Sequence, residues 1–391
     1  MYKIKTLNKI SHVGLDVLPR AEYEISSEIN HPDGIILRSY NMHDMELPAS
    51  LKAVGRAGAG VNNIPIEKCT ERGIVVFNTP GANANGVKEL VLAGLFLSSR
   101  NVVQGIEWAK TLIGEGDQVP KLIEKGKSQF AGPEIKGKTL GLIGLGAIGV
   151  MVANDAGSLG MKVLGYDPFI SVDRAWGLSR STEKSVSLDS LVSQSDYISI
   201  HAPLTDETKG MINKDRFALM KKGVRILNFA RNGLVNNADL RDAIAEGIVA
   251  NYITDFPDEE LLEMDNVIGI PHLGASTPEA EDNCAYMAAS QIKDFFECGN
   301  LNNCVNFPDC EMPFTSKHRI IIINKNVPAM VGKITGFIAD KGANIANMLN
   351  RQMGDHAYNI IDIDGDFSED DLTTLKEIDG IIMARLLTCN K

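Results

Sequence analysis

The sequence lacks the features that mark secreted, membrane-spanning or fibrous proteins. Six cysteines in 391 residues are too few for a disulfide framework, and they show no zinc-ligand spacing, so we expect free thiols and no metal site. The most hydrophobic stretch, residues 90–97, has eight residues, against roughly 20 needed to cross a bilayer. The N-terminus has no apolar run of signal-peptide length. These absences predict a soluble cytoplasmic protein.

Positive charge is also scarce, because 39 Lys and Arg stand against 50 Asp and Glu, for a net charge of −11 and a pI near 5.2. A general nucleic-acid or anionic-membrane binder needs a positive field, so neither partner is expected. An anionic small substrate stays possible, since a few arginines can dominate one binding site. The hydrophobic fraction of 44% is enough for buried cores. At roughly 150 residues per domain, the length predicts two or three domains.

Short apolar runs alternate with helix-length amphipathic segments up to about residue 270, which favours βαβ units and a parallel sheet. The runs that predict strands are residues 34–37, 74–77, 140–143, 161–165, 197–200 and 225–228. Two long helices are expected at about residues 86–110 and 278–297. They could carry the chain out of one α/β unit and back into it, which would split the first domain in sequence.

The composition changes after residue 298, where an Asn-rich stretch at 299–308 reads as a linker. Beyond it the pattern predicts a βαββαβ module of the ferredoxin-like type. Its strands are expected near residues 319–324, 345–349, 358–363 and 381–387, and its helices near 329–341 and 368–377. A hairpin is expected at residues 351–356.

A glycine-rich motif follows the predicted strand at residues 139–143, with Gly144, Gly146 and Gly149 in GxGxxG order. Gly144 permits a tight turn, Gly146 lets the backbone approach a pyrophosphate, and Gly149 allows the next helix to pack on the sheet. The next strand ends in Asp167, 18 residues beyond Gly149. Asp167 would accept bonds from the ribose hydroxyls and repel a 2′-phosphate, so the motif predicts NAD rather than NADP. The alternative is a structural glycine turn with a surface Asp.

Two residues at predicted strand ends could supply hydride-transfer chemistry from an alcohol carbon, which needs a base and a cation. Arg231 ends the run Asn228-Phe-Ala-Arg, and His272 follows 41 residues later in Pro-His-Leu-Gly-Ala-Ser-Thr. Each has an alternative interpretation when taken singly. A lone His is more often structural than catalytic, and a lone Arg is usually a surface ion-pair partner.

The order of these motifs resembles that of the NAD-dependent D-isomer-specific 2-hydroxyacid dehydrogenases. The C-terminal module is similar to an ACT domain, through residues 326–328, 342–345 and 361–364. The resemblance implies a flavodoxin-like substrate-binding domain split between residues 1–85 and 272–305. It also implies a Rossmann-type doubly wound sheet at 86–271 that binds NAD, and an ACT regulatory domain at 318–391.

The resemblance assigns catalytic roles to the two strand-end residues. Arg231 would hold the C1 carboxylate and the C2 oxygen, while His272 would be the general acid and base. A glutamate would hydrogen-bond the second imidazole nitrogen. Counting forward from Arg231 selects Glu260, whereas aligning Phe-Pro-x-Glu with one residue deleted after Asp255 selects Glu259. Both stay open, with Glu259 slightly preferred.

Further residues are assigned to substrate and cofactor by the same resemblance. Arg38 and Arg56 match two N-terminal loops and would bind a phosphate or carboxylate by bidentate bonds, although strand-end arginines also cap loops. The cofactor positions are Ala147 and Ile148 at the pyrophosphate, Ala202 and Pro203 under the adenosine, Phe229 and Ala230 beside the nicotinamide ribose, Asp255 at the carboxamide, and Gly274 and Ala275 flanking the nicotinamide.

The ACT-like tail narrows the expected activity. The resemblance implies oxidation of 3-phospho-D-glycerate to 3-phosphohydroxypyruvate with NAD, the first step of phosphorylated L-serine synthesis. Another D-2-hydroxyacid dehydrogenase, such as a glycerate/hydroxypyruvate reductase with a redundant tail, is the alternative. An NAD-sensing, co-repressor-like protein is a third interpretation. It is disfavoured because the chain retains Arg231, nearby glutamates and His272, which a sensor does not need.

Regulation and assembly are also implied by the ACT-like tail. Asn326 and Asn344 match positions at which serine-sensitive members bind L-serine across a dimer interface, and Asn324 stands where some of these relatives have His. The alternative is an ACT-like fold used only for assembly. The expected partners are therefore a phosphorylated 2-hydroxy acid, a possible L-serine effector and further copies of the chain in a homodimer or homotetramer.

Overall fold

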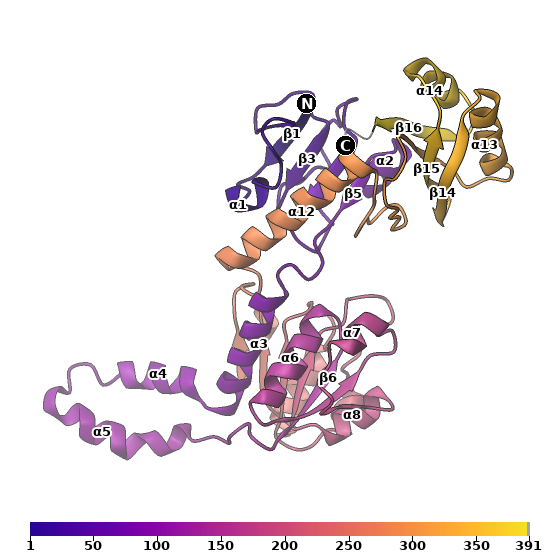
Figure 1. Ribbon diagram of the computed structural model, residues 1–391. Helices are drawn as coiled ribbons and strands as arrows, with labels where there is room; N and C mark the ends of the chain where they lie inside the picture. The colour runs from indigo at the N-terminus through magenta and orange to yellow at the C-terminus, as the bar shows by residue number, and fades with distance from the viewer. Residues whose placement is uncertain (389–391) are drawn as a thin grey trace. The chain divides into compact units, whose positions relative to one another are not determined.

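The computed structural model describes residues 1–388 and divides the chain into two compact units (Figure 1). The first unit combines Met1–Ala82 with Glu281–Lys391, and the second is Asn83–Ala280. None of the helices formed by residues 1–388 is both long and apolar enough to span a membrane.

The first unit is built on a five-stranded sheet in which every pairing is parallel. Its strands are β1 (Tyr2–Leu7), β2 (Tyr23–Ser26), β3 (Gly34–Leu37), β4 (Ala53–Arg56) and β5 (Val75–Phe77), with the short helices α1 (His12–Leu15) and α2 (Ile66–Glu71). The order β2-β1-β3-β4-β5 is that of a flavodoxin-like sheet. Ligands of such sheets bind outside the carboxyl ends of the strands. Arg38 follows β3 and Arg56 ends β4 at this edge.

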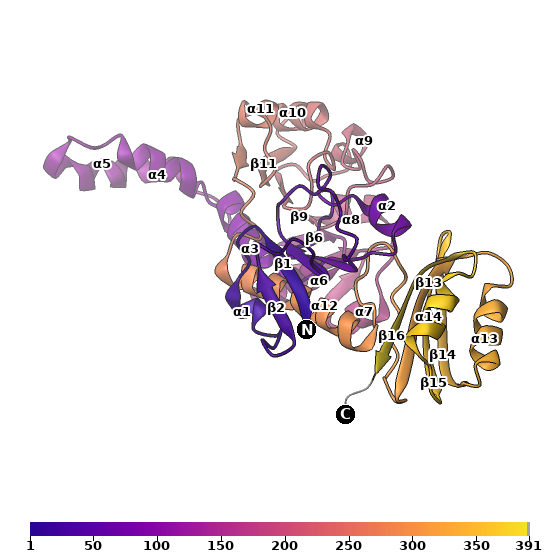
Figure 2. The ribbon, with the colours of Figure 1, turned by 90° about the horizontal axis from the view of Figure 1, so that it is seen from above.

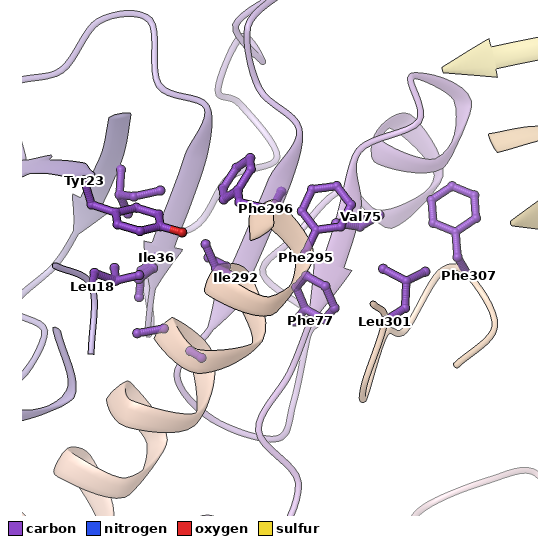
Figure 3. Packing of buried hydrophobic residues seen from close by; sticks show 14 of the residues in the cluster. Leu18, Tyr23, Ile36, Val75, Phe77, Ile292, Phe295, Phe296, Leu301 and Phe307 are labelled. Carbon is purple, nitrogen blue, oxygen red and sulfur yellow. The ribbon is translucent and has the colours of Figure 1, made fainter. Parts of the chain in front are cut away.

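The helix α12 (Pro278–Cys298) returns the chain to this sheet and supplies one side of its core. Figure 3 shows Ile292, Phe295 and Phe296 of α12 facing Ile36 and Phe77 of the strands. All five side chains are fully buried. The prediction of a first α/β domain that is split in sequence is therefore confirmed for its fold.

The C-terminal module has the predicted βαββαβ order and a four-stranded antiparallel sheet, β14-β15-β13-β16. Its elements are β13 (His318–Lys325), α13 (Met330–Asp340), β14 (Asn344–Met353), β15 (His356–Asp364), α14 (Glu369–Lys376) and β16 (Ile381–Thr388). Both helices cover one face of this sheet (Figure 2). On that face Ile320 and Ile322 pack with Ile334 of α13 and Leu375 of α14. This confirms an ACT-like fold.

The opposite face of the module's sheet packs on the rest of the first unit, so Ile321, Ile323 and Tyr358 belong to the same core as α12. Arg319 is fully buried in this contact and hydrogen-bonds to residues on both sides of it. Its guanidinium donates to both oxygens of Asp362, at 2.5 and 3.0 Å, and to the carbonyl oxygens of Cys298, Met312 and Pro313 at 2.7–2.9 Å. The buried charge is thus paired and fully hydrogen-bonded, as burial requires.

The second unit contains a seven-stranded parallel sheet in the order β12-β11-β10-β9-β6-β7-β8. Its strands are β6 (Thr139–Ile143), β7 (Lys162–Tyr166), β8 (Thr182–Lys184), β9 (Tyr197–Ile200), β10 (Val224–Asn228), β11 (Val249–Thr254) and β12 (Val267–Gly269). The helices between them are α6 (Ala147–Ser158), α7 (Val172–Trp176), α8 (Leu188–Gln194), α9 (Lys214–Phe217), α10 (Asn237–Ala245) and α11 (Glu259–Leu262). The strand order reverses at β6, so the glycine-rich loop lies at the topological switch point, as the prediction of a Rossmann-type sheet requires.

The prediction of one long helix at residues 86–110 is wrong. The structure has α3 (Ala84–Ser99) and α4 (Val102–Lys110), separated by an extended Arg100. The break has a tertiary cause, because the carbonyl oxygen of Ser98 accepts from Arg225 Nε at 2.7 Å and from Asn251 Nδ2 at 3.1 Å. The two side-chain donors take the place of the backbone N–H that this oxygen would accept from if the helix continued.

An arm formed by α4 and α5 (Val119–Gly126), with the 3-10 turns η1 (Gly116–Gln118) and η2 (Lys127–Phe130), extends away from the seven-stranded sheet (Figures 1 and 2). Trp108 and Phe130 pack against each other in it, with ring centroids 5.3 Å apart. The sequence patterns did not single out this arm.

Candidate active site

The glycine-rich loop is held by close backbone contacts at two of its three glycines. A Cβ on Gly144, which has φ +94°, would lie 2.8 Å from the backbone of His201. A Cβ on Gly149 would lie 2.2 Å from the carbonyl oxygen of Gly144. Gly146 differs, because a Cβ there would meet nothing within 4 Å among the described residues. The loop therefore needs two glycines for its own shape, and the third leaves its backbone open to a ligand.

Asp167 stands at the end of β7 with its carboxylate fixed against this loop. Its Oδ2 accepts from the N–H of Leu145 and its Oδ1 from the N–H of Phe169, both at 2.8 Å. Each carboxylate oxygen keeps a second acceptor position. The first turn of α6 has Gly146 as N-cap, with no side-chain cap within the described chain, so its N–H groups can bind an anion. These residues fit a dinucleotide with free ribose hydroxyls.

His201 lies at the end of β9, directly beside the loop. Burial lowers the pKa of its imidazole to about 4, so the ring is neutral at neutral pH. Its Nε2 lies 3.0 Å from Ser199 Oγ. The predicted adenosine positions Ala202 and Pro203 follow it, the first partly buried and the second exposed. Sequence reasoning assigned no role to His201, although its place after a buried strand was visible.

The segment that carries Arg231 is shaped by Asn228, a buried residue at the end of β10. Asn228 Oδ1 accepts from the N–H of Ala230 at 3.2 Å, while its Nδ2 donates to the carbonyl oxygen of Arg231 at 2.9 Å and to Tyr252 Oη at 3.1 Å. Phe229 is buried between them. The sequence motif contained Asn228 without revealing this function, which depends on three contacts made at once.

Arg231 and His272 lie on Phe256, the second residue after β11. The guanidinium carbon of Arg231 is 6.0 Å from the centre of the Phe256 ring, and the imidazole of His272 is 4.5 Å from it at a tilt of 50°. Arg231 and His272 are both exposed. The structure thus brings together the predicted cation and the predicted base, which lie 41 residues apart in the sequence. Both side chains lie against the same aromatic ring.

Asp255, which precedes Phe256, is buried to 2% exposure. Its Oδ2 accepts from the N–H of Gly274 at 3.4 Å, while its Oδ1 has no hydrogen-bond partner among residues 1–388. Burial raises the pKa of this carboxyl, and the nearby His272 and Arg231 oppose the rise. Ala275 follows Gly274 and is partly buried. A buried acceptor without a donor lowers the stability of the fold, because its desolvation is not compensated by a hydrogen bond. Such an oxygen is expected where a ligand supplies the donor.

The two candidate glutamates lie on α11, whose N-cap is Asp258. Glu260 faces α10, because its Oε1 is 3.3 Å from Arg241 Nη2 and its Oε2 accepts from Asn237 Nδ2 at 3.3 Å. Glu259 is exposed in the first turn. Within residues 1–388, neither Glu259 nor Glu260 makes a hydrogen bond or ion pair with His272.

In the first unit, Arg38 and Arg56 come together at the carboxyl ends of β3 and β4. Arg56 Nε donates to the carbonyl oxygen of Arg38 at 3.2 Å, and Asn63 Nδ2 donates to the same oxygen at 3.2 Å. The Arg38 guanidinium pairs with Glu281 of α12. The structure therefore places both arginines at the edge of the sheet where flavodoxin-like folds bind ligands, with the charge of Arg38 balanced by Glu281.

Gly58 fixes the position of the Arg56 side chain. It has φ +148°, and a Cβ on it would lie 1.8 Å from Arg56 Nη1 and 2.6 Å from its Cζ. The guanidinium thus packs directly over the Gly58 Cα. The sequence analysis assigned no role to this glycine, and only the contact shows why a side chain is excluded.

The three predicted effector residues do not meet within one chain. Asn324 is buried, accepts from Asn359 Nδ2 at 2.7 Å and donates to the carbonyl oxygen of Lys325 at 2.7 Å. Asn326 donates to Gln352 Oε1 at 2.7 Å. Asn344 lies opposite Asp364, the last residue of β15. The contacts of Asn324 and Asn326 lie near the other end of that strand.

In the part of the chain that the structure describes, no three His, Cys, Asp or Glu side chains gather as a metal site. Cys69, Cys284, Cys298, Cys304 and Cys310 are free thiols.

Comparisons with known proteins agree with this geometry. Residues 95–274 match the profile of the family described as D-isomer specific 2-hydroxyacid dehydrogenase, NAD binding domain. A D-3-phosphoglycerate dehydrogenase of Archaeoglobus fulgidus is 39% identical over 298 residues, covering 74% of this chain and 54% of the relative. One of Methanocaldococcus jannaschii is 34% identical over 355 residues, covering 88% and 64%. The chain thus spans less than two thirds of the length of either relative.

The solved structure of a 3-phosphoglycerate dehydrogenase from Entamoeba histolytica with NAD⁺ bound is also similar. It is 29% identical with a TM-score of 0.60, and the match covers 78% of this chain and 98% of that chain. Sequence, sheet order and the glycine-rich loop therefore lead to one assignment. Residues 95–274 belong to the D-isomer-specific 2-hydroxyacid dehydrogenase family, as its NAD binding domain.

Proposed function

We propose that the protein oxidises 3-phospho-D-glycerate to 3-phosphohydroxypyruvate with NAD, the first step of phosphorylated L-serine biosynthesis. The observation that carries this proposal is the placement of Arg231 and His272 on one aromatic ring at the carboxyl end of a nucleotide-binding sheet. The printed names of the relatives from Archaeoglobus fulgidus and Methanocaldococcus jannaschii support the substrate.

The cofactor would be held by the residues around the glycine-rich loop. The N–H groups of Ala147 and Ile148 begin α6 and would bind the pyrophosphate, while Asp167 would accept from the ribose hydroxyls. A 2′-phosphate would meet the Asp167 carboxylate and be repelled, so NAD is preferred to NADP. Bound NAD would accept the hydride that leaves C2 of the substrate.

The chain's own residues would do the remaining work at the reacting carbon. The Arg231 guanidinium would bind the C1 carboxylate and polarise the C2 oxygen. The His272 imidazole would accept the C2 hydroxyl proton as the alcohol becomes a ketone. Phe256 would keep both side chains at a fixed separation, since each lies against its ring.

Arg38 and Arg56 are proposed to bind the substrate's phosphate. Each charge-assisted hydrogen bond contributes about 1.5–3 kcal/mol, which corresponds to a factor of roughly 10 to 150. Arg38→Gln and Arg56→Gln should therefore lower kcat/KM for 3-phosphoglycerate by about that factor and leave kcat/KM for D-glycerate nearly unchanged. Arg20→Gln is the matched control, because Arg20 is exposed and lies before β2, at the amino edge of the sheet.

The experiment that tests the function is NADH formation, followed by absorbance, with a panel of 2-hydroxy acids. The proposal expects 3-phosphoglycerate to be the preferred substrate. Preference for D-glycerate, with no effect of Arg38→Gln or Arg56→Gln, would identify a glycerate/hydroxypyruvate reductase instead. No turnover of any 2-hydroxy acid would leave NAD sensing as the better account.

The protein is also proposed to act as a homodimer or homotetramer. The arm of α4 and α5 carries exposed Val102, Ile106 and Ile113, at 44%, 52% and 84% exposure, and a second copy of this chain is the proposed occupant of its apolar side. Light scattering should give a multiple of the chain mass. Ile106→Glu should lower it, and a monomeric wild type would contradict the proposal.

Inhibition by L-serine is proposed at a site shared by two ACT modules. β14 is an edge strand, and antiparallel pairing of two β14 strands about a twofold axis would bring Asn344 of one chain to the end of the other where Asn326 binds Gln352. Asn324 would contribute indirectly, because its amide is engaged by Asn359 and Lys325. Millimolar L-serine should inhibit the enzyme and Asn344→Ala should weaken the effect. Unchanged activity in the presence of L-serine would contradict this regulation and would favour a module that serves only in assembly.

A further inference from the structure

We propose that Glu281 is a specificity-determining residue that competes with the substrate's phosphate for Arg38. In the structure its carboxylate binds the Arg38 guanidinium and so occupies a position that a phosphate would take. An anion must displace it, and the displacement weakens the preference for phosphorylated over unphosphorylated substrates. The inference rests on the proposed function, in which Arg38 binds the substrate's phosphate.

The competing contact is an ion pair between two partly exposed side chains. Glu281 lies in the first turn of α12, and Arg38 directly follows β3. Arg38 Nη1 donates to Glu281 Oε1, and the two side chains are 35% and 49% exposed. Ion pairs at such exposure contribute little to stability, whereas a guanidinium that binds a phosphate through two parallel bonds holds it more strongly. The carboxylate is therefore a partner that a stronger anion can replace.

The backbone that carries Arg38 is held by two asparagines. Asn8 Oδ1 accepts from the N–H groups of Ser39 and Tyr40 at 3.1 and 2.7 Å. Asn63 Nδ2 donates to the carbonyl oxygens of Arg38 and Tyr40 at 3.2 and 2.7 Å. Because these bonds fix the loop, the exchange of one anion for another requires only the rotation of side chains.

The helix that carries Glu281 is also held in place. Ser11 Oγ donates to Asp282 Oδ1, and a Cβ on Gly14 would lie 2.3 Å from the Cβ of Ala285, so the backbone of α1 packs closely on α12. A displaced Glu281 carboxylate can rotate away, but it stays within the length of one side chain. It therefore continues to repel the anion that has replaced it.

A buried thiol beside the ion pair is affected by the carboxylate and by both arginines. Cys284 lies three residues after Glu281, on the same side of α12. Burial raises the pKa of the Cys284 thiol, Arg38 and Arg56 oppose the rise, and Glu281 adds to it. The carboxylate thus acts at the same place as the two arginines and with the opposite sign. The positive field at this edge of the sheet is weaker than two arginines alone would produce.

The displacement of Glu281 affects only ligands that bring negative charge to Arg38. D-Glycerate has an uncharged hydroxyl group at C3, so this group does not compete with the carboxylate. The phosphorylated substrate and the phosphorylated product are weakened alike, because both carry the phosphate through the reaction. Glu281 therefore opposes binding that is uniform between ground state and transition state, which changes KM and leaves kcat in place.

The test compares Glu281→Gln with the matched control Glu279→Gln, which removes an exposed carboxylate from the same turn of α12. KM and kcat are measured for 3-phosphoglycerate and D-glycerate, together with the Ki of inorganic phosphate at constant ionic strength. Glu281→Gln is also made in the Arg38→Gln background. As a readout that needs no turnover, the melting temperature is measured against the concentration of inorganic phosphate, with chloride as the reference salt.

Glu281→Gln should lower both the KM for 3-phosphoglycerate and the Ki of inorganic phosphate by about 3- to 10-fold, because a competing and repelling charge is removed. The kcat for 3-phosphoglycerate and the kcat/KM for D-glycerate should stay unchanged, as should every value for Glu279→Gln. In the Arg38→Gln background the substitution should change KM by less than about twofold, since the two residues act on each other. Inorganic phosphate should raise the melting temperature of Glu281→Gln at lower concentrations than that of the wild type.

Three results would overturn the inference. One is an unchanged or higher KM for 3-phosphoglycerate in folded Glu281→Gln, which would make Glu281 a support of Arg38 and not its competitor. Another is an equal gain in Glu279→Gln, which would be an effect of net charge alone. The third is the full gain in the Arg38→Gln background. If no 2-hydroxy acid is oxidised but phosphate stabilises Glu281→Gln at lower concentrations than the wild type, the proposed function fails and the competition at Arg38 stands.

Discussion

Gly58→Ala should weaken the proposed phosphate binding by Arg56 without removing any charged side chain. The Cβ of alanine would lie 1.8 Å from Arg56 Nη1, and atoms of this kind are in contact at about 3.5 Å. The guanidinium must therefore move by about 1.7 Å or the backbone must shift. Alanine at φ +148° adds a strain of about 1–3 kcal/mol.

A misplacement of 1 Å at a binding group can cost on the order of 100-fold, and complete loss of one charge-assisted bond costs roughly 10- to 150-fold. We therefore expect kcat/KM for 3-phosphoglycerate to fall by about 10- to 100-fold, with NADH binding unchanged. The free energy of unfolding should fall by about 1–3 kcal/mol.

The assay is steady-state NADH formation at saturating NAD, with urea unfolding in parallel. Gly60→Ala is the matched control in the same loop, because the nearest atom to its new Cβ would be Asn62 Oδ1 at 3.6 Å, an ordinary contact. Unchanged kcat/KM in Gly58→Ala, together with a large loss in Arg56→Gln, would refute the argument that Gly58 positions Arg56.

Three further predictions concern the cofactor, the module contact and a helix cap. Asp167→Ala should weaken NAD binding and reduce the preference for NAD over NADP by about tenfold or more, since about 1.4 kcal/mol of repulsion corresponds to that factor; equal preference in the wild type would contradict it. Arg319→Met should lower the free energy of unfolding by about 3–5 kcal/mol, because it leaves Asp362 buried without its partner, and Arg319→Met/Asp362→Leu should recover part of this in urea titrations. Hydrogen bonds from Ser368 and the ammonium of Lys341 lower the pKa of Asp371, so its contribution is present above its unfolded pKa and lost as pH falls through the folded value. The stability difference between wild type and Asp371→Asn should therefore shrink from pH 6 to pH 2, and an equal difference at both would exclude the cap.

Local patterns were sufficient to predict several strands of the two parallel sheets and the C-terminal module. The runs at residues 34–37 and 197–200 coincide with β3 and β9, because buried parallel strands are apolar throughout. The module's helices near 329–341 and 368–377 became α13 and α14. In each case the element is specified by residues within it.

The break between α3 and α4 could not be predicted in the same way. The Ser98 carbonyl oxygen is bound by Arg225 and Asn251, which lie 127 and 153 residues further along the chain. The apolar periodicity of residues 86–110 is helical on both sides of the break, so only the tertiary contacts end the first helix.

The site shows the same division. Gly144, Asp167, Arg231 and His272 could be proposed from the sequence because their predicted chemistry requires particular residue types at strand ends. The surroundings of the candidate carboxylates near His272 could not be predicted, since they depend on which acid is buried. The structure buries Asp255 against Gly274 and directs Glu260 to Arg241, and neither fact has a signature in residue spacing.

The account depends most on His272 acting as the base of an NAD-dependent oxidation. The direct measurement is the rate of NADH formation from 3-phosphoglycerate by the wild type and by His272→Gln. We expect steady turnover by the wild type and a loss of about 10²- to 10⁴-fold in the variant, with NADH binding retained. Turnover by His272→Gln within a few-fold of the wild type would contradict the account.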